Sequence, residues 1–188
     1  MTRQQTQTNK RKITMRSLKN WDVGTSILHL GLAVGVTLQL FVALVMHGHH
    51  WIFVIHEWVG AFLILVVLAQ WAWILWIKPE NMHHLFPWDP AGLRAVKNDL
   101  QNLLKGQLPE GGAKNKGGLP GFICGLGFIA VTGMALSGLL IFIGFQLHMN
   151  PHFFKKMHSG IANFVWVYWV GHVAMAITHR FFDKQQPA

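Results

Sequence analysis

Residues 119–147 read LPGFICGLGFIAVTGMALSGLLIFIGFQL, which is 29 consecutive residues without a charged side chain. About 20 apolar residues in an α-helix are enough to cross the hydrocarbon core of a bilayer. Three other stretches are similarly long and largely apolar, and they cover residues 23–46, 51–77 and 151–182. We therefore expect an all-α protein in which these four segments form a transmembrane four-helix bundle.

The composition also favours a membrane protein over a soluble one. Hydrophobic residues make up 52% of the chain and charged residues only 12%. The charged share is about half that of an ordinary soluble protein. The segment that starts at Val23 is too long for the core of a signal peptide and has no clear cleavage site, so we expect it to remain as the first span.

The distribution of charge predicts the orientation in the membrane. Lys and Arg number 16 against 7 Asp and Glu, and 14 of the 16 lie outside the two connections that follow the first and third spans. Only Lys155 and Lys156 lie on the other side, so the positive-inside rule places both termini in the cytoplasm. We expect a multi-pass membrane protein with cytoplasmic tails at residues 1–20 and 183–188 and a membrane domain at residues 21–182. The positive charge then faces membrane lipid, and no nucleic acid is implied.

The connection between the second and third spans carries a helix signal of its own. Asp89 followed by Pro90 is typical of a helix N-cap and the first helical residue, and Asn150-Pro151 repeats this signal before the fourth span. Apolar residues then recur at helical spacing as far as Gly106. They are Leu93, Val96, Leu100, Leu103 and Leu104. We expect a short amphipathic helix on the cytoplasmic surface of the membrane.

Cys124 is the only cysteine and lies inside an apolar run. No C-x-x-C or C-x-x-C-H motif occurs, which excludes a disulfide framework, a zinc ribbon and a covalently attached haem. Any haem in this protein must therefore be held non-covalently.

Four of the twelve histidines lie within the apolar spans, where a polar group without a partner is costly. They are His29, His56, His158 and His172. His158 and His172 are fourteen residues apart, so an α-helix places them on one stripe, about 21 Å apart along its axis. Counted from the span ends, His29 shares the cytoplasmic depth of His172, and His56 shares the outer depth of His158. Two b haems, each with two axial histidines, would require two such pairs in a four-helix bundle.

The residues alone leave other interpretations open. Each histidine could be a core residue bonded to a backbone carbonyl or to Ser or Thr, and the set could instead form a metal or proton path. A metal transporter would use the histidine-rich outer turn with His47, His49 and His50. A structural membrane anchor for a redox complex is a further alternative. His179, seven residues after His172 on nearly the same face, is a second candidate for the same ligand position.

Three motifs and one connection point to a known group of proteins. The motifs are W-D-(x)5-L-H at residues 21–29, I-H-E-W-V-G at residues 55–60 and M-H-S-G-I-A-N-(x)8-H-(x)6-H at residues 157–179. Over roughly residues 20–182 they resemble the bacterial di-haem cytochrome b family. That family includes the membrane subunits of formate dehydrogenases and nickel-iron hydrogenases and the stand-alone cytochrome b(561). The connection at residues 89–109 looks like that of the hydrogenase-type branch.

The resemblance implies two non-covalent b haems with the histidine pairing that depth also suggests, His29 with His172 and His56 with His158. It implies one-electron transfer across the bacterial inner membrane between the quinone pool and a redox partner. Such a partner would be a periplasmic c-type cytochrome or a dehydrogenase or hydrogenase subunit. No catalytic residue is implied, and the chain would be either a carrier or the electron-transfer subunit of a quinone-linked oxidoreductase.

Overall fold

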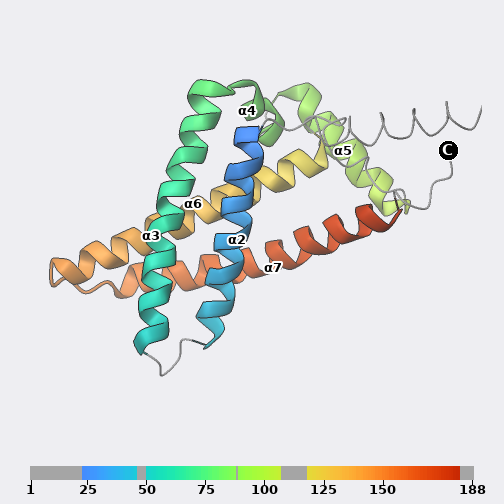
Figure 1. Ribbon diagram of the computed structural model, residues 1–188. Coiled ribbons are helices and arrows are strands. Elements are labelled where there is room, and N and C mark those ends of the chain that lie inside the picture. The colour runs from blue at the N-terminus through green and yellow to red at the C-terminus, as the bar shows by residue number, and fades with distance from the viewer. Residues whose placement is uncertain (1–22, 46–49, 88, 107–117, 183–188) are drawn as a thin grey trace, which may run out of the picture.

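The computed structural model describes residues 23–45, 50–87, 89–106 and 118–182. The tails predicted at residues 1–20 and 183–188 lie outside the described residues, as do His47 and His49 of the outer turn. The described elements are all helical (Figure 1). They are α2 (Val23–Val45), α3 (His50–Ala72), the π-helix η1 (Trp73–Ile77), α4 (Glu80–Leu85), α5 (Pro90–Leu104), α6 (Leu119–Gln146) and α7 (His152–Phe182).

Four helices in the described part of the chain are long and apolar enough to cross a membrane. They cover Val23–Val45, His50–Ile77, Leu119–Gln146 and His152–Thr178. Their outer faces carry large exposed apolar side chains such as Leu65, Phe142 and Val167. Lipid chains are as apolar as these side chains, so such faces are stable in a bilayer. The predicted all-α, four-span membrane fold is confirmed.

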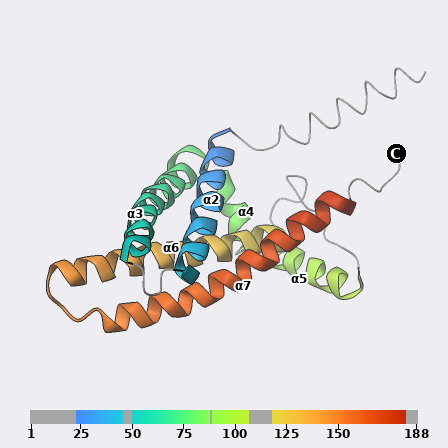
Figure 2. The ribbon, with the colours of Figure 1, turned by 60° about the horizontal axis from the view of Figure 1, so that its bottom comes forward.

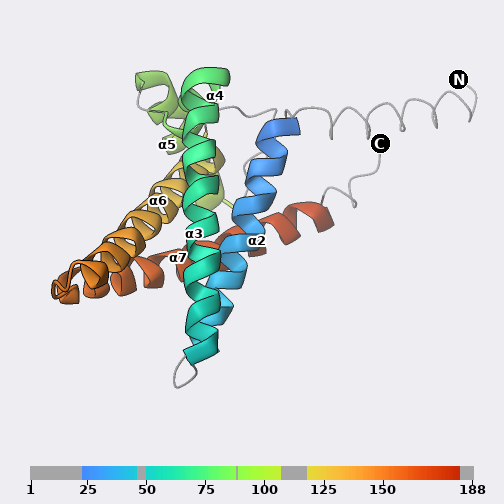
Figure 3. The same cartoon turned by 60° about the vertical axis from the view of Figure 1, so that its left-hand side comes forward.

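The four spans form two antiparallel hairpins, α2 with α3 and α6 with α7 (Figure 1). The two hairpins cross steeply instead of running parallel, which the turned views make plain (Figures 2 and 3). The tips of the hairpins consequently point in different directions. Contact between the hairpins is made by α3 against α6 and by side chains of α7.

Two small apolar clusters hold the crossing together. One contains Leu40, Ala130 and Val165, and the other contains Val67, Ile74 and Phe128. Two indole N–H groups add polar links between the hairpins. Trp169 of α7 donates to the Thr37 hydroxyl of α2 at 3.0 Å, and Trp71 of α3 donates to the Thr132 hydroxyl of α6 at 3.2 Å. A buried indole N–H needs such a partner, so these bonds fix which faces of the helices meet.

The connection between α3 and α6 contains two short helices where the sequence predicts one. The predicted helix is α5, and Asp89 caps it by accepting a hydrogen bond from the Gly92 N–H at 3.1 Å. The unpredicted helix, α4, follows Lys78 and Pro79 directly. It packs so closely on α6 that an added Cβ at Gly125 would overlap the Leu85 carbonyl. The absence of a side chain at residue 125 thus allows this contact.

The turn between α6 and α7 differs from the prediction by one residue. The Asn150 side chain accepts from the His152 N–H at 3.0 Å and so satisfies one N–H group at the start of α7. However, the helix begins at His152 and not at Pro151. The Pro151 carbonyl accepts the first helical bond, from Lys155 at 2.9 Å, which places Pro151 at the cap position itself.

Candidate functional site

The structure brings the four span histidines together as two pairs, and α7 contributes one histidine to each. The imidazole centres of His158 and of His56 in α3 lie 6.3 Å apart. The centres of His172 and of His29 in α2 also lie 6.3 Å apart. Both pairs therefore join α7 to the other hairpin at the crossing.

The spacing within each pair fits two imidazoles on opposite sides of one haem iron. A metal-bound imidazole nitrogen lies about 2 Å from the metal and about 1 Å from the ring centre. Two such rings on one iron have their centres about 6 Å apart. The two pairs use partners from different helices and still have the same separation, so the donor set fits a bis-histidine haem at both places.

The ring nitrogens of the α7 histidines have hydroxyl partners. Ser137 of α6 lies with its Oγ atom 2.9 Å from His158 Nδ1. The Tyr168 hydroxyl lies 3.4 Å from His172 Nδ1, and the two rings stack with centres 5.3 Å apart. Histidines that bind a metal through one nitrogen commonly hydrogen-bond an oxygen through the other. The contacts at Nδ1 thus leave Nε2 of each ring for a metal.

His56 has a different environment. Its Nδ1 atom is buried and has no hydrogen-bond partner among the described residues. Gln39 of α2 approaches it from the backbone side and donates to the His56 carbonyl at 2.8 Å. A buried nitrogen that the protein does not satisfy is unusual and suits a residue whose partner is a bound group.

Sequence reasoning did not identify Ser137, Tyr168 or Gln39. Tyr168 precedes His172 by four residues, so helical spacing alone could have indicated their contact. Ser137 and Gln39 are polar residues within apolar spans, but which histidine each one meets depends on how separate helices are rotated. That rotation is a property of the packed molecule.

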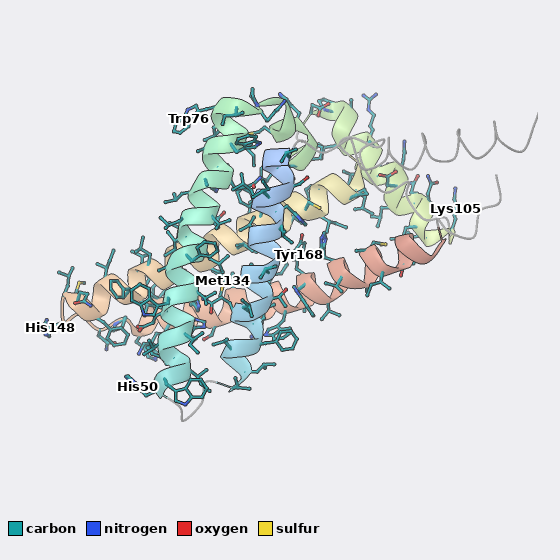
Figure 4. All side chains as sticks on the ribbon, viewed as in Figure 1. His50, Trp76, Lys105, Met134, His148 and Tyr168 are labelled. Atoms are coloured by element: carbon teal, nitrogen blue, oxygen red, sulfur yellow. The ribbon has the colours of Figure 1, made fainter. Side chains whose placement is uncertain are left out.

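Two other described histidines lie away from the two pairs. His50 and His148 lie at the tips of the two hairpins, whereas Tyr168 lies where the hairpins cross (Figure 4). His179 belongs to α7, but its side chain is outside the described part of the structure. Among the described residues, no three or more His, Cys, Asp or Glu side chains are grouped so as to hold a metal ion.

The comparison with protein families gives one match. The family model described as prokaryotic cytochrome b561 matches residues 20–187, which include all four spans and both histidine pairs. No curated protein and no solved structure matches the chain. Because the family model covers most of the sequence, this chain belongs to the prokaryotic cytochrome b561 family of membrane cytochromes b, which transfer electrons across the membrane.

Proposed function

We propose that the chain carries electrons through two b haems, one bound by His29 and His172 and the other by His56 and His158. The observation that supports this most directly is the equal separation of 6.3 Å between the imidazole centres of both pairs. Bound haem supplies the one-electron Fe(III)/Fe(II) couple.

The side chains of the chain determine what these sites can do. Two histidines would hold the iron at each site, and an iron held in this way would favour electron transfer over oxygen activation. Because α7 supplies one histidine to each pair, a single helix sets the distance between the two sites. The surrounding apolar side chains exclude water, and this burial influences the reduction potentials.

We further propose that the His29/His172 pair lies toward the cytoplasm and that both termini are cytoplasmic. The support is the placement of 14 of the 16 basic residues. In this orientation electrons pass between quinone and a redox partner protein such as a c-type cytochrome or a dehydrogenase or hydrogenase subunit. Family membership favours such a quinone-linked role.

The direct test is the haem content of the detergent-purified protein, measured as the pyridine haemochrome after expression with added haem. We expect about two b haems per chain in the wild type. His158→Ala and His172→Ala should each remove about one haem, because each deletes one axial ligand. His152→Ala is the matched control, since His152 is an exposed histidine on the same helix and belongs to neither pair.

A well-folded wild-type protein without haem would contradict the proposal and return attention to metal transport. Retention of both haems by the ligand variants would contradict the assignment of residues. His179→Ala separates the two candidates on the last turns of α7. The His179→Ala variant should keep both haems. Loss of one haem from His179→Ala but not from His172→Ala would mean that His179, and not His172, is the ligand paired with His29.

A further inference from the structure

Ser137 is the most deeply buried polar residue in the described part of the protein, with no exposed surface. It lies in the middle of α6, facing the His158 imidazole across the α6/α7 hairpin at 2.9 Å. The next residue, Gly138, leaves space for the same ring, because an added Cβ would lie 3.5 Å from His158 Cε1. The imidazole therefore lies directly against the backbone of α6 at residues 137–138.

The hydrogen-bond partners of Ser137 determine which way its bond to His158 runs. The hydroxyl oxygen lies 2.8 Å from the Gly133 carbonyl and 3.1 Å from the Met134 carbonyl, and both carbonyls can only accept. A serine hydroxyl has one proton, so donating it to a carbonyl leaves Oγ as an acceptor toward His158.

The Ser137 oxygen, as an acceptor at Nδ1, selects one tautomer of the ring. The hydrogen resides on Nδ1, and Nε2 keeps its lone pair. A neutral imidazole binds a metal through that lone pair, so Ser137 prepares the nitrogen that a metal needs.

The pair at the other depth has no equivalent arrangement. Tyr168 lies on the same helix as His172, and its hydroxyl is 3.4 Å from Nδ1, which is long for a hydrogen bond. The main contact there is ring stacking, with an interplanar angle of 21°. His158 is consequently held by a directed hydrogen bond and His172 by stacking.

We propose that Ser137 is a positioning residue that fixes the orientation and tautomer of His158 and lowers the reduction potential of the haem bound there. A hydrogen bond from Nδ1–H to an oxygen makes the imidazole a stronger electron donor, which stabilises ferric over ferrous iron. The two sites then differ in potential because their second nitrogens are held differently. This inference rests on the proposed ligation by His158.

The test is a spectroelectrochemical redox titration of the haem-loaded, detergent-purified protein. Ser137→Ala should raise the midpoint potential of one haem and leave the other unchanged, and Ser137→Thr should restore the wild-type value because it keeps the hydroxyl. The matched control is Thr132→Val. Thr132 lies on α6 and donates to the i−4 carbonyl of Phe128 at 2.8 Å, as Ser137 does to Gly133, but the other partner of its hydroxyl is the Trp71 indole N–H and not a histidine.

Electron paramagnetic resonance of the oxidised protein provides a second readout. The low-spin ferric signal depends on the orientation of the axial rings, so Ser137→Ala should shift one of two signals. Selective loss of one haem from Ser137→Ala, with the other potential unchanged, would support the inference equally. Unchanged potentials and signals, or equal shifts in Thr132→Val, would overturn it. If the wild type binds no haem, the proposed function itself has failed, so the two failures are distinguishable.

Discussion

An imidazole within a membrane span has two nitrogens that need partners, and the histidines of this protein differ in what lies next to the ring. His158 has a serine hydroxyl at 2.9 Å, and His172 has a stacked tyrosine ring. His56 has a buried Nδ1 with no hydrogen-bond partner among the described residues. The hydrogen bond from His158 to a serine is also what the core-histidine interpretation expects, but it satisfies only Nδ1. The separation of 6.3 Å between the His158 and His56 rings fits the proposed iron between them, which would be the partner of the other nitrogen.

Gly127 controls the position of Tyr168 and, through it, that of His172. An added Cβ at residue 127 would overlap the Tyr168 ring, so Gly127→Ala must displace that ring and the imidazole stacked on it. We expect about 10- to 100-fold weaker haem binding at one of the two sites, the usual cost of disturbing a partner of a metal ligand. Haem transfer to excess apomyoglobin measures this. Gly160→Ala is the control, since Gly160 faces open space on α7. Equal transfer rates for both variants would show that Tyr168 does not position His172.

At the scale of the helices, the sequence predicts well where each helix begins and ends. It predicts poorly how each helix is rotated about its axis. The four spans and the Asp89 cap of α5 follow from apolar length and capping residues. The rotation of a span about its axis cannot be predicted in this way. Lipid and protein interior are equally apolar, so the sequence of a span shows no periodic pattern. Val67 is 3% exposed and the adjacent Leu68 is 59% exposed, yet both are aliphatic. For the same reason the contact of Ser137 with His158 could not be predicted. The additional helix α4 is only Glu80–Leu85, which is too short to show a helical periodicity.

The link between α5 and α6 depends on Asp99. Its carboxylate accepts from the Leu119 N–H at 2.9 Å, and so satisfies one of the free N–H groups at the start of α6. Asp99→Ala should cost about 1 kcal/mol, as loss of a helix cap does. The released connection should be cleaved faster by trypsin after Lys105, which limited proteolysis of the purified protein measures. Asn98→Ala, one residue earlier, should leave the rate unchanged. Equal rates in both variants would mean that α5 is held on α6 by other contacts.

At the scale of the whole molecule, counting residues from the span ends was enough to predict which histidines would meet. The depth of a residue in a span depends only on the helical rise per residue, so it can be predicted without knowing how the helices pack. The steep crossing of the two hairpins was not predictable, because it depends on interlocking side chains such as Trp169 with Thr37 and Trp71 with Thr132. The described residues therefore agree with the sequence on which histidines lie next to each other. They show in addition how the two hairpins are joined.

The orientation across the membrane can be tested by cysteine labelling. In a Cys124→Ala background, Met149→Cys lies in the exposed turn after α6 and Thr8→Cys lies in the N-terminal tail. A membrane-impermeant maleimide applied to spheroplasts should label Met149→Cys at once and Thr8→Cys only after permeabilisation, since basic segments stay in the cytoplasm. The reverse pattern would invert the topology and move the His29/His172 pair to the outer side.

The placement of one histidine of each pair on α7 has a consequence for how the protein is made. Their partners, His29 and His56, belong to the other hairpin, so iron bound at either site would cross-link the two hairpins. A group that binds only the joined arrangement stabilises it by mass action. With the proposed ligation, maturation of this protein would be coupled to haem supply. Chains made under haem starvation would be more easily separated into two hairpins and more exposed to membrane proteases, so cellular abundance would follow cofactor availability without any dedicated sensor.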